Sequence, residues 1–128
     1  MRPELSALVP RHKSDLENAH SAVALGWPAV EPIVSQLLQW LQDINWPVAH
    51  VLAPFFAEVG AALAPHIRRV LETEDDVWKY YVIQAVVAHS PGLARALEAE
   101  LKRVALRPTP SERKEEVDMV AQEALEQL

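Results

Sequence analysis

The chain has 128 residues, of which half are apolar and 23% are charged, with three glycines and no cysteine. This length predicts a single domain over residues 1–128, and the absence of cysteine excludes disulfides and thiolate metal sites. The net charge of −6 is concentrated near the end, since residues 111–128 carry six acidic and two basic side chains. An acidic chain whose basic residues are dispersed in short pairs is a poor ligand for nucleic acid.

Two observations bear on location. The N-terminal segment MRPELSALVPRHKSD lacks the apolar run that a signal peptide needs. No stretch approaches the roughly 20 apolar residues that span a membrane. We therefore expect a cytoplasmic protein that does not enter a membrane.

Apolar residues recur at three- and four-residue spacing along the chain, which predicts helices. The first begins at Ser14 with the capping-box sequence S-D-L-E and ends at Gly26. A second covers residues 31–42, with Pro32 in its first turn, where a missing N–H is tolerated. Its apolar stripe is broad, as in a helix packed between two others.

Two strongly apolar helices are expected at the centre of the chain, over residues 45–60 and 75–92. Because apolar residues surround both almost completely, we expect both to be enclosed. Pro54 lies inside the first and should kink it. A shorter helix over residues 61–71 carries an early proline, Pro65, and joins the two.

Two amphipathic segments complete the chain. Residues 93–106 form one predicted helix, and Thr109 with Glu112 forms a capping box that opens the last. The last helix places a set of apolar residues on one face: Val117, Val120, Ala121, Ala124, Leu125 and Leu128. Its acidic residues lie on the opposite face, as in the outer helix of a stack.

Landmark residues recur at a nearly constant interval. Each central helix opens on a tryptophan and closes on a glycine, and 32 residues separate Trp46 from Trp78 and Gly60 from Gly92. A period of this size in a helical chain predicts stacked helix pairs. The prediction is therefore an all-α fold of about seven helices.

No recognisable catalytic, cofactor or metal motif occurs. The five histidines lack helical spacing to one another, and H-E-x-x-H, P-loop and dinucleotide glycine patterns are absent. The sequence E-E-V-D at 115–118 resembles a chaperone tail motif, but that motif acts at a free carboxyl terminus, so here we interpret it as a coincidence on a helix. We expect no catalytic residue, cofactor or metal.

The turns before the two central helices carry the candidate binding residues. Aromatic and acidic side chains lie together there, and the predicted partner-binding residues are Asp43, Trp46, Glu74, Asp75, Asp76 and Trp78. Exposed, they would form a ridge along one edge that binds a locally basic protein. In the alternative interpretation the tryptophans fill the core and the aspartates cap helices. A second aromatic group, Phe55, Phe56, Tyr80 and Tyr81, is expected in the core.

The motifs DINWPVA (43–49) and DDVWKYY (75–81), with the segments at 8–19 and 107–125, resemble a family of small bacterial proteins known only as a domain of unknown function. The resemblance implies an α-solenoid, a HEAT-like right-handed α-α superhelix, and no assigned activity. HEAT repeats often carry an arginine where this chain has Ala49 and Tyr81, so their Asp–Arg ladder is missing.

These observations favour a protein–protein interaction module, such as a bacterial immunity or adaptor protein. A stack of rigid helices offers a preformed surface at low entropic cost. The alternative is an enzyme or small-ligand protein with a pocket between the central helices, which would use Asp75, Asp76 or His50 as acid or base.

Overall fold

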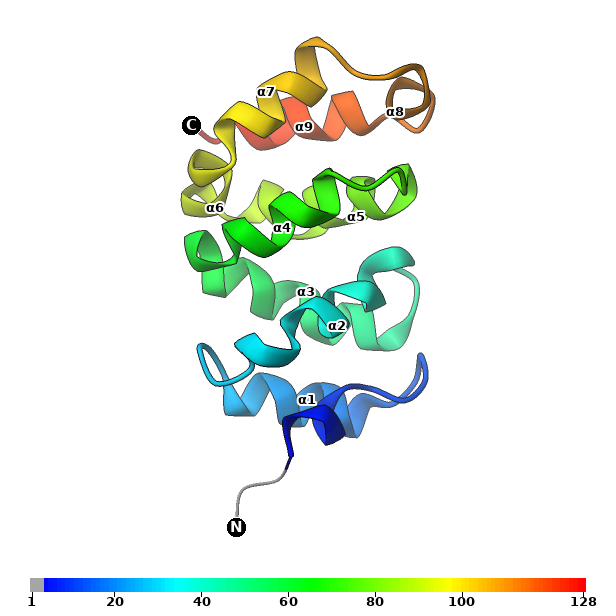
Figure 1. Ribbon diagram of the computed structural model, residues 1–128, viewed down its shortest axis with the longest axis vertical. Coiled ribbons are helices and arrows are strands. Elements are labelled where there is room, and N and C mark those ends of the chain that lie inside the picture. The colour runs from blue at the N-terminus through cyan, green and yellow to red at the C-terminus, as the bar shows by residue number, and fades with distance from the viewer. Residues whose placement is uncertain (1–3) are drawn as a thin grey trace. The chain divides into compact units, whose positions relative to one another are not determined.

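The computed structural model describes residues 4–128, which form helices joined by turns and short loops (Figure 1). Helices account for 74% of these residues and no strand occurs among them, which confirms the all-α prediction. The chain divides into two compact units, the first ending at Phe55 and the second spanning Phe56–Leu128. The single domain over residues 1–128 stays a prediction. Residues 1–3, the start of the segment inspected for a signal peptide, lie outside the described residues.

The first unit is built from short helical segments that lead into one long helix. In chain order they are η1 (Leu5–Leu8), α1 (Leu16–Leu25), η2 (Glu31–Ile33), α2 (Val34–Leu38), η3 (Gln39–Gln42) and α3 (Pro47–Val59), which continues past the boundary. The predicted helix over 31–42 is therefore a short α-helix flanked by 3-10 turns, the tighter form common at helix ends.

The first cap differs from the prediction by one residue. Asp15, rather than Ser14, caps α1, and its two carboxylate oxygens accept hydrogen bonds from the backbone N–H groups of Asn18 at 3.4 Å and Arg11 at 2.9 Å. A carboxylate accepts at two oxygens where a hydroxyl has one, which explains the shift of the cap. The Arg11 bond holds the pKa of Asp15 below its ordinary value. Gly26 ends the helix at φ 79°, as its position predicts.

Helix α3 is not enclosed on all sides. His50, Pro54 and Glu58, four residues apart, are exposed and form one solvent-facing stripe, while the rest of the helix is buried or half-buried. The helix continues through Pro54 without interruption. The proline leaves the carbonyl of His50 without its helical donor, and on an exposed stripe water can supply one.

One helical run among the described residues is long and apolar enough to cross a membrane. It covers Pro47–Leu71, 25 residues that include α3 and the helical segments directly after it. In its most apolar 18-residue stretch, 44% is buried. The expectation that no stretch reaches this length is therefore corrected. A single such run is weak evidence for a span, because the core helix of a soluble protein meets the same criterion.

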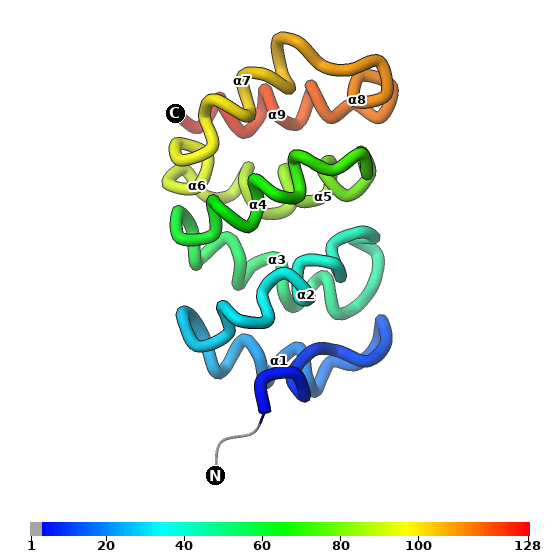
Figure 2. The backbone as a smooth tube through the Cα atoms, viewed as in Figure 1, coloured from blue at the N-terminus to red at the C-terminus, as the bar shows by residue number. Residues whose placement is uncertain are grey.

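The second unit contains the remaining helices. They are η4 (Gly60–Leu63), α4 (Ala64–Leu71), α5 (Asp76–Ala85), η5 (Val87–His89), α6 (Pro91–Ala96), α7 (Glu98–Leu106), α8 (Pro110–Lys114) and α9 (Val117–Leu125). Helix α9 packs on both α5 and α7, and α4 packs on α5. The α4–α5 turn and the α7–α8 connection lie at the same end of this unit (Figures 1 and 2).

The interior of the second unit is apolar apart from Lys79, Ser90 and Glu112. Its largest fully buried side chains are Phe56, Leu63, Ile67, Ile83, Leu93, Leu97, Leu101 and Glu112. Burying a leucine or isoleucine side chain contributes roughly 1.5–3 kcal/mol, so this set stabilises the unit. The buried glutamate needs a separate explanation.

The landmark residues do not occupy equivalent helix positions. Gly60 has φ 70° and follows α3, whereas Gly92 lies inside α6 and α5 already ends at Ala85. Trp46 precedes the first residue of α3, whereas Trp78 is the third residue of α5. The 32-residue spacing is therefore present in the sequence, but the residues that it relates differ in their local backbone geometry.

Two predicted helices are each broken into two. Residues 93–106 divide between α6 and α7 at Leu97, with φ −106° and ψ 14°. The last helix divides between α8 and α9 at Glu115 and Glu116, where Glu116 adopts the left-handed conformation with φ 62°. Four residues of its predicted apolar face are buried, whereas Leu125 is half-buried and Leu128 is exposed; the buried ones are Val117, Val120, Ala121 and Ala124. E-E-V-D therefore starts at a helix break rather than within a helix.

Candidate functional site

A cluster of buried and half-buried charged side chains lies between α5, α7 and α8. The Glu112 carboxylate is fully buried and accepts two bonds from the Arg103 guanidinium, Nη1 to Oε1 and Nη2 to Oε2, each at 2.8 Å. Lys79 Nζ lies 3.2 Å from Oε2 of the same carboxylate and 3.0 Å from Asp76 Oδ1. We call these four residues the ion cluster.

The predicted capping box positions Glu112. The Glu112 N–H donates to Thr109 Oγ1 at 3.1 Å, and the Thr109 N–H donates to Glu112 Oε1 at 2.9 Å. The carboxylate thus receives hydrogen bonds at both oxygens from backbone, guanidinium and ammonium donors. A buried charge is tolerated when it is paired and hydrogen-bonded in this way.

The pKa values follow from this geometry. The Arg103 hydrogen bonds, with smaller contributions from the Thr109 N–H and Lys79, lower the pKa of Glu112 to about 2. The Glu112 carboxylate in turn raises the pKa of Arg103. Glu112 is therefore ionised at neutral pH in spite of its burial.

Helix α5 shows that burial does not follow polarity here. Lys79 is buried at 5% exposure, whereas Val77, two residues earlier, is 42% exposed. The apolar pattern of residues 75–92 predicted an enclosed helix, and the exposure of Val77 corrects that prediction. The Lys79 ammonium group can be buried because the carboxylates of Asp76 and Glu112 neutralise its charge. With Lys79 on the buried side of α5, Val77 faces solvent.

A hollow of about 790 Å³ lies beside the ion cluster, and we call it the acidic groove. Its lining residues come from the end of α4, the α4–α5 turn, α5, α7, and α8 with its N-cap: Leu71, Glu72, Thr73, Glu74, Asp76, Lys79, Arg103, Thr109, Ser111 and Glu112. Four of these side chains are acidic and two are basic, a formal charge of −2. Glu72 and Glu74 are exposed, whereas the ion cluster holds Asp76, so the groove presents carboxylates to solvent.

The groove continues into a smaller hollow of about 340 Å³, which shares Leu71, Glu72 and Arg103 with it. Arg68 Nε bonds Glu100 Oε1 there at 2.6 Å, an ion pair between α4 and α7. This pair and the ion cluster fix the helices that form the walls.

The structure places the predicted binding residues in different surroundings. Glu74 and Asp76 line the acidic groove. Asp75 caps α5, accepting from the Trp78 N–H at 3.0 Å, so its predicted capping role is confirmed, and Trp78 is half-buried.

In the first unit, Asp43 accepts from the Asn45 N–H at 2.9 Å in the turn before α3. Trp46 is half-buried and meets Trp40 edge to face, with ring centroids 5.5 Å apart. Both rings line a hollow of about 380 Å³ with Gln36, Gln39 and others. The shared edge expected for the two turns stays a prediction.

The expected aromatic core is half present. Phe55 and Phe56 are buried, at 7% and 0% exposure, whereas Tyr80 and Tyr81 are half-buried. The two tyrosines face a surface hollow, because the opposite side of α5 carries the buried Lys79.

The acid–base alternative finds little support in these contacts. Asp76 is paired with Lys79, Asp75 caps a helix, and His50 is exposed on α3 in a stretch assigned to the first unit. Within the described part of the chain, no group of three metal-ligating side chains occurs.

Sequence reasoning missed Lys79, Arg103 and Glu112 as a set. Glu112 was assigned its capping role correctly, but Lys79 lies 33 residues away along the chain. No local pattern indicates that pairing. The one available signal was a lysine within an otherwise apolar segment, which requires either exposure or a buried partner.

Comparison with family models identifies the class of protein. Residues 8–125 match the model described as Domain of unknown function (DUF5071), so the chain belongs to this family. The match confirms the resemblance to a domain of unknown function noted from the motifs. A search of curated proteins found no match.

Proposed function

We propose that the protein is an interaction module that binds a locally basic segment of a protein partner in the acidic groove. The observation that carries the proposal is the pair of exposed carboxylates, Glu72 and Glu74, at the rim of a hollow of about 790 Å³. A surface of this charge attracts basic segments and speeds their encounter. The proposal keeps the basic partner predicted from the sequence and moves its main contact to the groove.

Preorganisation supports binding rather than catalysis. The ion cluster and the Arg68–Glu100 pair hold the groove walls through contacts between α4, α5, α7 and α8. A wall that is already fixed loses little conformational entropy when a partner binds. The charged groups of the ion cluster inside the groove are paired with one another. The rim carboxylates, Glu72 and Glu74, therefore make the contact with the partner.

The wider setting follows from the same proposal. Contacts of α4 with α5 and of α7 with α9 support helix pairs stacked in the manner of a HEAT-like α-α superhelix. A cytoplasmic immunity or adaptor protein of bacterial type, which holds one partner on preformed helices, fits this arrangement. The right-handed superhelix is part of the proposal.

Site-specific crosslinking tests the location of the surface. A photoreactive amino acid replaces Ser111, an exposed groove residue, and in a matched variant it replaces Gln122, exposed on α9. We expect the Ser111 probe to crosslink one protein in cells, at a peptide rich in lysine or arginine. Equal crosslinking from Gln122, or attachment to an acidic peptide, would count against the proposal.

A further inference from the structure

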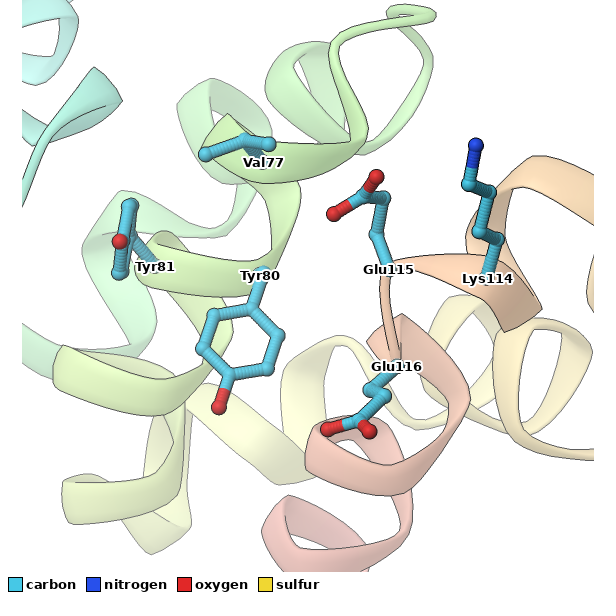
Figure 3. A pocket seen from close by; sticks show the side chains of 6 residues that line it. All are labelled: Val77, Tyr80, Tyr81, Lys114, Glu115 and Glu116. Atoms are coloured by element: carbon cyan, nitrogen blue, oxygen red, sulfur yellow. The ribbon is translucent and has the colours of Figure 1, made fainter.

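Another hollow lies on the side of α5 away from the acidic groove. It has a volume of about 260 Å³ and its lining residues are Val77, Tyr80, Tyr81, Lys114, Glu115 and Glu116 (Figure 3). We call it the tyrosine pocket. It shares no lining residue with the acidic groove.

Two tyrosine rings form one wall of this pocket. Tyr80 and Tyr81 meet edge to face, with centroids 5.6 Å apart and an interplanar angle of 84°. The two half-buried rings therefore stand at right angles and offer aromatic surface to the hollow. The face of an aromatic ring carries negative partial charge and attracts cations.

Two carboxylates form the opposite wall. The break between α8 and α9, where Glu116 has φ 62°, places Glu115 and Glu116 at the pocket. Both carboxylates face the Tyr80 side, whereas the Lys114 ammonium group points away (Figure 3). Neither glutamate makes an ion pair with another residue in the part of the chain that the structure describes. A non-glycine residue at positive φ is sparsely populated and occurs preferentially at functional positions.

We infer that the tyrosine pocket binds a single guanidinium group, the side chain of an arginine from a protein partner. A planar guanidinium can stack on a tyrosine face and donate in-plane hydrogen bonds to a carboxylate at the same time. A lysine ammonium is a compact and strongly hydrated charge, so it is less suited to stacking on a ring while bonding a carboxylate. The inference deepens the proposed function, since the arginine would belong to the same partner.

The test uses a small probe, so that it does not depend on finding the partner. N-acetyl-arginine methylamide is titrated into the isotope-labelled protein, and backbone amide shifts are followed by NMR. The neutral isostere N-acetyl-citrulline methylamide is the matched control. We expect saturable shifts for the arginine probe, centred on Tyr80, Tyr81 and Glu115, with a dissociation constant on the order of millimolar, and weak shifts for citrulline.

Variants then separate the contributing groups. Glu115→Gln and Glu116→Gly each remove a carboxylate, and glycine suits the positive φ at 116. We expect each to weaken arginine binding by about threefold or more, while Tyr80→Phe, which keeps the ring, binds within about twofold. Glu123→Gln, on the exposed side of α9, should leave binding unchanged.

The outcomes distinguish this inference from the proposed function. Equal shifts for arginine and citrulline, no saturable shift for either, or shifts unchanged by Glu115→Gln and Glu116→Gly would overturn the pocket assignment. Replacing Glu72 and Glu74 by glutamine should leave the arginine titration unchanged, because those residues belong to the acidic groove. Loss of arginine binding in that double variant would place the probe in the groove and also overturn the inference.

Discussion

Glu112 shows how a local motif becomes the centre of a tertiary contact. Its carboxylate completes the capping box with Thr109 and also neutralises Arg103 and Lys79 from two other helices. A buried carboxylate with fewer partners would be strongly destabilising. The position of α8 against α5 and α7 therefore depends on this one side chain.

The pKa of Glu112 predicts how stability changes with pH. It is about 2 in the folded protein against an ordinary value of 4.5, so folding favours the ionised form. The resulting stabilisation, roughly 3 kcal/mol, is complete above pH 4.5 and is lost as the pH falls toward 2. We expect Glu112→Gln to be less stable than the wild type by about this amount at pH 7, and the difference to shrink below pH 4.5.

Denaturant unfolding of both proteins across this pH range measures the difference directly. Taking the difference removes the effect of other carboxylates with lowered pKa, such as Asp15 and Glu98. A gap that stays constant from pH 7 to pH 3 would show that the charge of Glu112 contributes nothing to folding.

At the scale of helices, the sequence predicted which helix faces are buried better than it predicted where helices begin and end. The capping box at Thr109 and the buried face of α9 depend on neighbours within one helix; the box is confirmed, and four of the six predicted residues of the face are buried. The breaks at Leu97 and Glu116 fall where no glycine or proline marks them, so helical periodicity continues across them. The burial of Lys79 could not be predicted, because its partner Glu112 belongs to another helix and periodicity carries no information about such contacts.

The two glycines of the apparent repeat give a test at this scale. Gly60 has φ 70°, and a Cβ there would lie 3.5 Å from Ser90 Oγ, whereas Gly92 is helical and a Cβ added there would meet nothing within 4 Å. Alanine at 60 should therefore destabilise by about 1–2 kcal/mol, because left-handed backbone is unfavourable for alanine. Alanine at 92 should stabilise by up to about 1 kcal/mol through its helix propensity.

Thermal or denaturant unfolding of Gly60→Ala and Gly92→Ala measures both effects. Opposite signs support the structural assignment of the two glycines. Destabilisation of equal size at both positions would instead restore the equivalence that the 32-residue spacing suggested.

At the scale of the whole molecule, charge is unevenly divided between the two units. From the sequence, residues up to Phe55 carry five acidic and three basic side chains, and residues from Phe56 carry thirteen and nine. The acidic groove and the tyrosine pocket both belong to the second unit. Composition alone indicated an acidic protein with a basic partner, but it could not locate the groove, whose walls come from two separate segments, residues 71–79 and 103–112.

The fold also changes which charges should be altered in a binding experiment. Reversing Asp75 or Asp76 would remove a helix cap or a member of the ion cluster, so any loss of binding could reflect misfolding. Glu72 and Glu74 are exposed and outside the ion cluster. Their replacement by glutamine changes the groove charge with little effect on folding.

The association rate of the partner captured through Ser111 tests the central claim most directly. It is measured at increasing ionic strength for the wild type, for the double variant Glu72→Gln/Glu74→Gln, and for Asp43→Asn in the first unit as a control. The account predicts a rate that falls as salt rises, a several-fold slower rate for the double variant at low salt with a weaker salt dependence, and no change for the control. An association rate indifferent to both salt and the double variant would contradict binding in the acidic groove.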